Sequence, residues 1–403
     1  MPSLLLLASK AGYQTEAFAA AAARLNVKLD LATNRCHHLD DPWRDGALAV
    51  DFDHPELAPQ NWDGITAVGD QAAIIAATLA ERFGNLRYHP LKAVLACRNK
   101  FELRERFRQA GLLTPSYVRV PLAEPPHNPG YPCVLKPLGL SASRGVIRAN
   151  NQQEFDAAFR RITRLLTKTP DLTRDPQSAF IQVEEFIPGR EFAIEGLVTN
   201  GRLQVLTIFD KPDPLDGPFF EETIYTTPSR ETPETQQEIR DTTQRAVSAL
   251  GLTSGPIHAE CRVNETGVWM LEVAARPIGG LCARVLRFAS GLSLEEVIIR
   301  HALGDPVDHE TLAPEGSAVM MIPIPEAGVY QGVRGVEEAL ELPGIESVDI
   351  TAVPGQILVP LPEGASYLGF IFARASAPAE AERLVRAGHR KLAFDLQPTL
   401  RLL

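Results

Sequence analysis

The sequence predicts an α/β protein with more than one domain, and three observations lead to this prediction. The chain has 403 residues, and at about 100–200 residues per domain two or three domains are expected. Short apolar runs alternate with helical patterns over residues 1–96, which is the βαβ pattern of a parallel sheet covered by helices. Further along the chain, two predicted strands at 257–263 and 268–273 are joined by a short turn, which indicates antiparallel pairing.

The composition excludes several classes of protein. Hydrophobic residues make up 45% and charged residues 22% of the chain, ordinary values for a globular protein with real cores. Forty Lys and Arg stand against 50 Asp and Glu, giving a net charge of −10, which argues against a general nucleic-acid or anionic-membrane surface. Five cysteines without a CxxC pair favour a reducing cytoplasm and no zinc site. The adjacent His37 and His38 are interpreted as part of a solvated loop.

The N-terminal unit, residues 1–96, is expected to begin with a buried strand rather than a signal peptide, because no basic segment precedes Leu4–Ala8. No apolar run reaches the roughly 18–20 residues of a membrane span. Asp70 is expected to cap the second helix, and residues 83–97, which show no strong pattern, are expected to carry a linker. The elements predicted in this unit are strands at 4–8, 27–32 and 65–68 and helices at 14–25 and 71–82.

The middle unit, residues 97–305, is predicted to mix helices with antiparallel strands. Its last two strands are joined by Asn264-Glu265-Thr266-Gly267, a tight-turn signal. The predicted strands are 134–135, 146–148, 180–185, 191–198, 202–209, 257–263 and 268–273, and the predicted helices are 100–110, 152–166, 233–250, 281–289 and 294–302. The last unit, residues 306–403, is predicted to hold strands at 318–324, 357–359 and 368–373 and a helix at 379–392.

Two segments carry residue types suited to phosphate binding. Arg98-Asn99-Lys100 opens a helix, and Lys136 ends a strand just before the loop Gly139–Gly145, which is rich in glycine and serine. Backbone N–H groups of such a loop can approach phosphate oxygens, and the lysine adds positive charge. No Gly-Lys-Ser/Thr opens a helix after the loop, so it is not a Walker loop. Taken alone, it fits a plain β-hairpin about as well.

A third segment, Val183–Phe192, is suited to a nucleoside. The extended stretch from Glu184 to Ile187 can offer backbone N–H and C=O groups to an adenine edge, and Glu191 after the turn can hold ribose hydroxyls. Taken alone, the segment fits an edge strand with solvated acids better.

The fourth segment places two acids on neighbouring strands. Glu260 and Glu272 lie on strands joined by the tight turn, and two converging carboxylates suit Mg²⁺ or Mn²⁺ that carries nucleotide phosphates. Arg276 offers a planar donor fork to a carboxylate or phosphate, and Gly279-Gly280 is expected to open a helix whose first N–H groups attract an anion. The alternatives are surface carboxylates and a structural ion pair.

These four motifs, in this order, resemble the ATP-grasp superfamily of carboxylate–amine ligases over about residues 97–303. The resemblance implies an ATP-grasp fold with a Rossmann-like N-terminal αβ domain, a lid subdomain at about 116–186 and a C-terminal α+β cap. The L-amino-acid (dipeptide) ligase and carnosine synthase branch is the most similar. In D-alanine–D-alanine ligases Asn stands at the position of Ala274, whereas this branch has small residues there and an arginine two residues later. The segment Tyr367–Ala375 also resembles that branch.

The resemblance implies ATP as the nucleotide and Mg²⁺ or Mn²⁺, two ions, as the metal. Lys100 and Lys136 would hold phosphates, with Lys136 also near adenine, and Arg276 would contact the transferred phosphoryl group. The other implied roles are the lid over the phosphates (Ser141, Ser143, Gly145), adenine binding (Glu184, Glu185, Phe186, Ile187), ribose binding (Glu191), metal binding (Glu260, Glu272) and the substrate side (Glu222, Tyr225, His258, Arg276, Gly279, Gly280).

The implied reaction joins a carboxylate to an amine through an acyl phosphate and releases ADP and phosphate. The implied partners are small carboxylates and amines, amino acids foremost, with neither nucleic acid nor membrane, and such ligases commonly form homodimers. Tyr225 stands where similar ligases have His, which leaves the amino-acid preference open, and a solvated Glu222 beside a packing Tyr225 fits equally well. The alternatives are a ligase for a non-amino-acid amine, a biotin-carboxylase-like or formyl-phosphate-forming relative, and a nucleotide-binding module without turnover.

Overall fold

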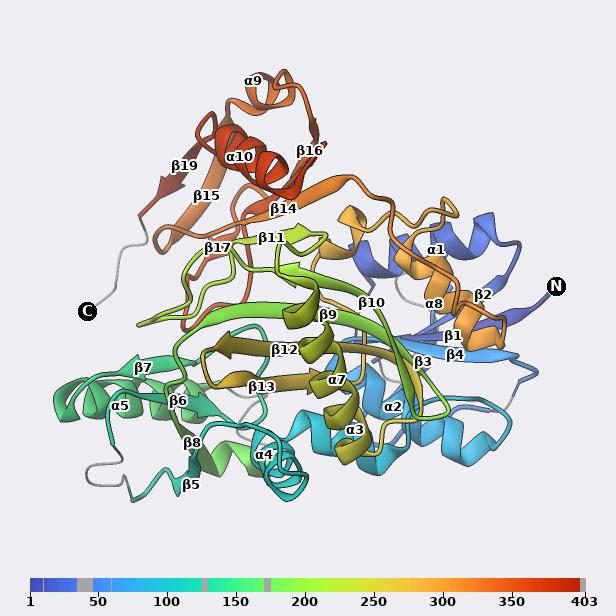
Figure 1. Ribbon diagram of the computed structural model, residues 1–403, viewed down its shortest axis with the longest axis horizontal. Helices are drawn as coiled ribbons and strands as arrows, with labels where there is room; N and C mark the ends of the chain where they lie inside the picture. Colours follow the sequence, from blue (N-terminus) through green and yellow to red (C-terminus); the bar gives the residue numbers. More distant parts are fainter. Residues whose placement is uncertain (10, 35–45, 59, 125–129, 170–174, 399–403) are drawn as a thin grey trace.

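The computed structural model describes residues 1–9, 11–34, 46–58, 60–124, 130–169 and 175–398 (Figure 1). His37 and His38 lie outside the described residues. The N-terminal unit is a parallel sheet of order β3-β2-β1-β4, as predicted. Every residue of β1 is buried, which explains its unbroken apolar run. Its strands and helices are β1 (Ser3–Ala8), α1 (Tyr13–Arg24), β2 (Lys28–Asn34), β3 (Leu48–Val50), β4 (Gly64–Val68) and α2 (Asp70–Phe83).

Two predictions for this unit are wrong. Asp70 does not cap α2: it is the first residue of the helix, the cap position is Gly69, and no side chain accepts a capping bond there. The stretch predicted as a linker contains a helix, α3 (Leu91–Arg98). Burial explains it, because Ala93, Val94 and Cys97 pack into the large core cluster that also holds α2, and tertiary packing outweighs a weak local pattern.

The predicted lid region forms an antiparallel sheet of order β5-β8-β6-β7. Helix α5 lies against it and buries Phe155, Phe159 and Ile162 in a core shared with these strands. The elements are α4 (Lys100–Gln109), which precedes the sheet, then β5 (Tyr117–Pro121), β6 (Cys133–Pro137), β7 (Ile147–Ala149), α5 (Gln152–Lys168), the short 3₁₀ turn η1 (Pro176–Ala179) and β8 (Phe180–Glu185).

An eight-stranded sheet of order β13-β12-β9-β10-β11-β14-β18-β16 runs through the centre of the molecule (Figure 1). It passes continuously across residue 305, where the sequence predicts a domain boundary, because β11 pairs with β14. In β12 and β13, Glu260 lies directly opposite Glu272, and the pairing register shifts after Glu260. The elements are β9 (Arg190–Thr199), β10 (Arg202–Asp210), β11 (Ile224–Thr227), α7 (Pro233–Leu250), β12 (Ser254–Asn264), β13 (Gly267–Ala274), α8 (Leu294–Leu303), β14 (Gly316–Ile322), β16 (Ile345–Ile350), β18 (Gly369–Ala375) and α10 (Pro378–His389).

The helix predicted over 281–289 is wrong. Only a single 3₁₀ turn, η2 (Cys282–Val285), forms there. The backbone groups beyond it bond to a distant segment: Ala289 N donates to Thr311 O and Ala313 N donates to Arg287 O. Gly279-Gly280 therefore opens no α-helix. A three-stranded sheet of order β17-β15-β19 completes the C-terminal unit, with β15 (Gly328–Arg334), α9 (Val336–Leu340), β17 (Ile357–Leu358) and β19 (Ala393–Gln397).

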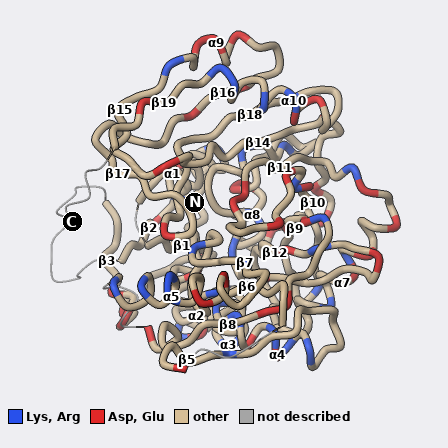
Figure 2. Tube along the Cα trace, turned by 90° about the vertical axis from the view of Figure 1, so that its left-hand side faces the viewer, with Lys and Arg blue, Asp and Glu red and all other residues tan. Residues whose placement is uncertain are grey.

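Acidic and basic residues are interspersed along the chain trace (Figure 2). Among the described residues, no helix combines the length and apolar character that crossing a membrane requires.

Candidate active site

A cavity of about 680 Å³ lies between the lid sheet, the central sheet and the C-terminal unit. Tyr13 and Asp70 reach it from the N-terminal unit, and Tyr367 and Phe370 reach it from the C-terminal unit. Every site residue predicted from the sequence lines this cavity except Gly145. Segments more than 150 residues apart thus supply one site, which is the convergence that the four motifs led us to expect.

Lys100 enters the cavity from the first turn of α4. Asn99 caps this helix by accepting hydrogen bonds from Phe101 N and Glu102 N, which places the lysine at a positively polarised helix end. Lys100 Nζ donates to Leu140 O at 2.7 Å and lies 3.7 Å from Glu272 Oε2. The cation therefore links the glycine-serine loop to one of the two predicted metal carboxylates.

Lys136 and Glu184 form a buried ion pair with a third residue, Arg104. Glu184 accepts from Arg104 Nε at 2.7 Å and from its second terminal nitrogen at 3.2 Å, and Lys136 Nζ lies 2.7 Å from Glu184 Oε2. Burial alone would raise the pKa of Glu184, but the two cations outweigh it and hold the pKa at about 2. Burial also lowers the pKa of Lys136. Because the Glu184 carboxylate is occupied by two cations, its role toward adenine stays a prediction.

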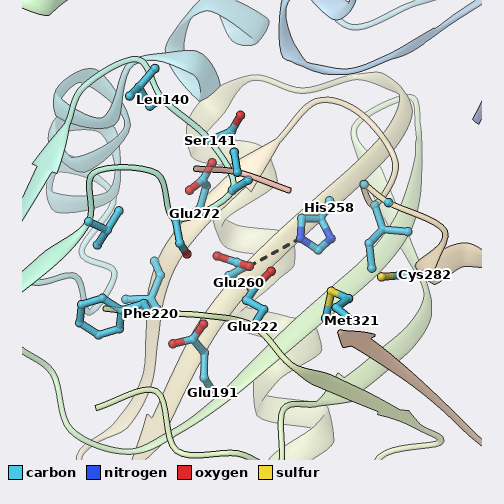
Figure 3. Close-up of a pocket in the computed structure, with 18 of the residues that line it drawn as sticks. Leu140, Ser141, Glu191, Phe220, Glu222, His258, Glu260, Glu272, Cys282 and Met321 are labelled. Carbon is cyan, nitrogen blue, oxygen red and sulfur yellow. Dashed lines mark ion pairs between the residues drawn. The ribbon is translucent and has the colours of Figure 1, made fainter. Parts of the chain in front are cut away.

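Glu260 and Glu272 face each other across β12 and β13, and both line the cavity. Each takes part in a different ion pair: Glu272 with Lys100, and Glu260 with Lys211. Among the described residues, the acids whose oxygens all lie within 4.8 Å of one another are Glu191, Glu222 and Glu260, and Figure 3 shows them along the same side of the cavity. Glu272 is outside that group, so the predicted metal pair stays a prediction.

Lys211 lies among those three carboxylates. Its Nζ is 2.9 Å from Glu191 Oε1, 2.8 Å from Glu260 Oε1 and in contact with Glu222. Burial alone would lower the pKa of Lys211, yet the three negative charges raise it well above its ordinary value. Burial raises the pKa of Glu222 to about 7, against the opposing charge of Lys211. Glu191 is also held by Arg262, whose Nε donates to its second oxygen at 2.9 Å.

Arg276 follows β13 and reaches across to the N-terminal unit. Its Nε donates to Asp70 Oδ1 at 2.7 Å, and one terminal nitrogen donates to Pro277 O at 3.0 Å. Burial alone would raise the pKa of Asp70, but the guanidinium outweighs it and lowers the pKa to about 2. The arginine is thus fixed at the cavity wall, between Glu272 and the segment Pro277–Gly280.

His258 is oriented by a buried acid beneath the cavity. Its Nδ1 contacts Glu195 Oε1, its Nε2 lies 3.7 Å from Glu260 Oε1 (Figure 3), and the other Glu195 oxygen accepts from Ile278 N at 3.0 Å. Burial alone would lower the pKa of His258, but Glu195 outweighs it and raises the pKa to about 9. Glu195 therefore connects the predicted substrate histidine to the loop that follows Arg276.

The glycine-serine loop rests on the C-terminal unit. Gly145 N donates to Pro362 O and Arg144 Nε donates to Glu363 O, both at 2.8 Å. Arg161 of α5 adds a hydrogen bond of 2.7 Å to Glu363 Oε2. Ser141 and Ser143 face the cavity, whereas Gly145 does not line it. A Cβ at Gly145 would lie 2.6 Å from Pro137, so this glycine serves close packing.

The remaining predicted residues form the nucleoside and substrate walls. Phe186 and Ile187 are buried, and Arg148 lies over the Phe186 ring at 4.0 Å. Glu185 is exposed and accepts from Ser116 at 3.1 Å. Tyr225 is buried against Phe209, with ring centroids 5.5 Å apart. Its burial agrees with the packing interpretation of this tyrosine, although it also lines the cavity.

Five residues that hold the site together were not predicted: Asp70 in this role, Arg104, Glu195, Lys211 and Arg262. Arg104 had a usable signal, because four residues after Lys100 it shares one helix face with it. Glu195 interrupts the apolar run Phe192–Val198, and Arg262 lies between Cys261 and Val263. A charge buried in such a strand must be paired. Lys211 stands in a stretch of aspartates and prolines that indicates only a loop.

Two family models match this chain. Residues 129–285 match the ATP-grasp domain, and residues 320–397 match the L-amino acid ligase C-terminal domain 2. The structure resembles the crystal structure of L-amino acid ligase from Bacillus licheniformis, with a TM-score of 0.83, 25% sequence identity and coverage of 99% of each chain. The chain therefore carries an ATP-grasp domain followed by an L-amino acid ligase C-terminal domain. These two domains and the similar L-amino acid ligase structure confirm the resemblance and the fold class predicted from the motifs.

Other solved structures share this fold at lower sequence identity, and one further protein matches by sequence. Phosphoribosylglycinamide synthetase from Anaerococcus prevotii has a TM-score of 0.69 at 15% identity, with coverage of 98% of this chain and 100% of that chain. The biotin carboxylase domain of Hydrogenobacter thermophilus 2-oxoglutarate carboxylase, solved with MgADP, has a TM-score of 0.68 at 15% identity, with coverage of 97% and 90%. An uncharacterized protein, y4rH, of Sinorhizobium fredii is 23% identical over 339 residues, 83% of this chain and 68% of that protein.

Proposed function

We propose that this ligase joins the carboxyl group of one L-amino acid to the amino group of a second. A carboxylate oxygen attacks the γ-phosphorus of ATP, the bond to ADP breaks, and an acyl phosphate forms. The amine nitrogen then attacks the acyl carbon, loses a proton and expels phosphate. The products are ADP, phosphate and a dipeptide or a related amide.

The observation that supports this proposal is the charge arrangement of the cavity. Lys100, Lys136 and Arg276 line it together with Glu260 and Glu272. A carboxylate and a triphosphate repel each other, so their approach needs positive charge that is already in place. The three cations are held by ion pairs and hydrogen bonds to protein groups, which keeps them oriented before any substrate arrives.

The carboxylates suit a divalent cation with ATP. Glu260 and Glu272 offer hard oxygen ligands from paired strands at the cavity wall, as Mg²⁺ and Mn²⁺ prefer. We assign two such ions to these residues, where they would neutralise the phosphates when bound. Lys100 and Lys136 would bind phosphate oxygens, and Glu191 would accept from the ribose. Glu184–Ile187 would frame the adenine.

On the substrate side, Glu222 would accept from a substrate ammonium, and Arg276 would bind the charge that moves from the γ-phosphate to the acyl phosphate. An acyl phosphate is water-labile, so the loop with Ser141 and Ser143 would exclude water during the reaction. The substrate wall would be completed by Tyr225, His258, Gly279 and Gly280. The resemblance to similar ligases suggests a homodimer and a cytoplasmic setting for this reaction.

A substrate screen tests the proposal. ADP release is measured with ATP, Mg²⁺ and pairs of L-amino acids, and the products are identified by mass spectrometry, with Glu260→Gln as the inactive control. We expect ADP and a dipeptide of the matching mass to form in equal amounts. ADP formed only with an amine that is not an amino acid would favour the alternative ligase, and nucleotide binding without ADP under any pairing would contradict catalysis.

A further inference from the structure

The ammonium of Lys211 donates hydrogen bonds to three carboxylates from three different segments of the chain. Glu191 comes from β9, Glu222 from the segment before β11, and Glu260 from β12. A lysine ammonium has three N–H donors, and all three point at a carboxylate oxygen. The side chain of Lys211 is only 2% exposed. Its Nζ lies 5.2 Å from the centre of the Tyr225 ring, so an aromatic face closes the remaining side.

The three carboxylates line the cavity, but Lys211 is not among the described residues that line it. Lys211 therefore lies behind the acids and does not form part of the cavity wall. The acids have three separate proposed roles: ribose for Glu191, a substrate ammonium for Glu222 and the metal for Glu260. Without a central cation, carboxylate oxygens within 4.8 Å of one another would repel and separate.

We propose that Lys211 is a positioning residue of the ligase reaction, a built-in cation that holds the ribose, amine and metal carboxylates in one fixed arrangement. The inference rests on the proposed function for the roles of the three acids. Lys211 occupies the space that a divalent cation would take among these acids in the protein without nucleotide. When the ammonium is removed, a divalent cation can take its place, because the three carboxylates offer hard oxygen ligands that a metal ion can draw together.

The test is Mn²⁺ binding to the full chain without nucleotide, followed by electron paramagnetic resonance. Wild type should bind Mn²⁺ weakly, and Lys211→Met should gain one site at least about tenfold tighter, because a buried positive charge has been removed. Lys92→Met, at an exposed position of α3, should match wild type. Lys211→Met with Glu222→Gln should lose the new site. Equal affinity in wild type and Lys211→Met would overturn the proposal.

Thermal melting covers the case in which Lys211→Met folds poorly. The double variant with Glu222→Gln has the same cluster charge as wild type, so we expect it to recover most of the melting temperature lost by Lys211→Met. A double variant as unstable as the single one would show that Lys211 acts by packing, and would overturn the proposal. The Mn²⁺ binding and the thermal melting are both measured without substrates. An absence of amide synthesis in wild type would therefore count against the proposed function and not against Lys211.

A kinetic readout separates positioning from general stability. Lys211→Met should raise the KM values for ATP and for the amine together, because Glu191 and Glu222 lose the same anchor. A loss confined to kcat, with both KM values unchanged, would contradict the shared role. Lys211→Arg should not rescue these values, because a planar fork cannot direct three donors from one point.

Discussion

Asp70 and Arg276 are joined by a hydrogen bond of 2.7 Å although 206 positions separate them in the chain. Asp70 begins a helix of the N-terminal unit, and Arg276 follows a strand of the central sheet. The N-terminal unit therefore does more than pack against the ligase core. It supplies the carboxylate that orients the arginine at the centre of the proposed reaction.

Asp70→Asn should lower kcat about fivefold to tenfold, because an amide oxygen can accept the same bond without its charge, a loss of about 1 kcal/mol. Affinity for ATP should change much less. Steady-state kinetics and calorimetric ATP binding check both expectations, with the exposed Asp53→Asn as the control. An unchanged kcat would show that the Arg276 guanidinium holds its place without this partner.

Arg276→Lys should lower kcat by about 10²-fold or more, in line with the loss of one preorganised donor. Lysine cannot reproduce the forked contact with a charge that moves between two positions. ATP binding should weaken much less, because the proposed adenine and ribose contacts of Glu184–Glu191 would remain in the variant. If ATP affinity collapses as far as kcat does, Arg276 is a ground-state or structural residue.

Glu260→Gln and Glu272→Gln should each nearly abolish turnover, because a metal ligand loses its charge. The matched control is Glu265→Gln, an exposed acid in the turn between the same two strands. Turnover and Mn²⁺ binding with ADP are measured on all three variants. A wild-type rate in either active-site variant would contradict the assignment of that residue.

Hydrogen exchange at Gly139–Gly145 should slow when Mg·ADP or Mg·ATP is added, because phosphate oxygens would accept from loop N–H groups. The amide of Gly145 already donates to Pro362 O, so the largest change should fall on residues before it. Mass-spectrometric exchange with and without nucleotide checks this. Equal exchange across the loop would count against a lid.

Glu184→Gln should destabilise the protein most at neutral pH. The pKa of Glu184 in the fold is about 2, below its ordinary 4.5, so the ionised group contributes its full stability above about pH 4.5. That contribution, on the order of 3 kcal/mol, is lost as the pH falls toward 2. The free energy of unfolding in urea should therefore differ from wild type by nearly the same amount at pH 7 and pH 5, and by a smaller amount at pH 3.5. Glu326→Gln, at an exposed position, is the control, and a constant difference would contradict the argument.

Local patterns were sufficient for the strands that carry the site. Alternation and the tight turn placed Glu260 and Glu272 on paired strands, and the structure puts them opposite each other. The order of the four motifs identified the fold through its resemblance to the ATP-grasp superfamily. The folded chain brings these four motifs, which are far apart in the sequence, to one cavity. Nearly all predicted residues therefore line one cavity.

Long-range pairing was not predictable from the sequence. The sequence alone favoured Glu184 as a solvated acid of an edge strand. In the structure it is buried and forms ion pairs with Arg104 and Lys136, and no periodic pattern in the sequence predicts these two pairs. Helix α3 depends on burial rather than local signal. The apolar stretch 281–289 has a helical composition, yet its backbone forms hydrogen bonds with residues 311–313. The periodicity of side chains within 281–289 cannot predict hydrogen bonds to a segment more than 20 residues away.

The glycine-serine loop is tied to the C-terminal unit by the hydrogen bonds of Gly145 and Arg144 to Pro362 and Glu363. If the loop is the proposed lid, its opening would break those bonds, and we therefore expect product release to depend on a segment more than 200 residues downstream. Exchanging this C-terminal segment between relatives would alter turnover speed without altering any group that touches a nucleotide. The number and strength of the hydrogen bonds between the loop and the C-terminal unit can therefore vary while the residues that line the cavity stay the same.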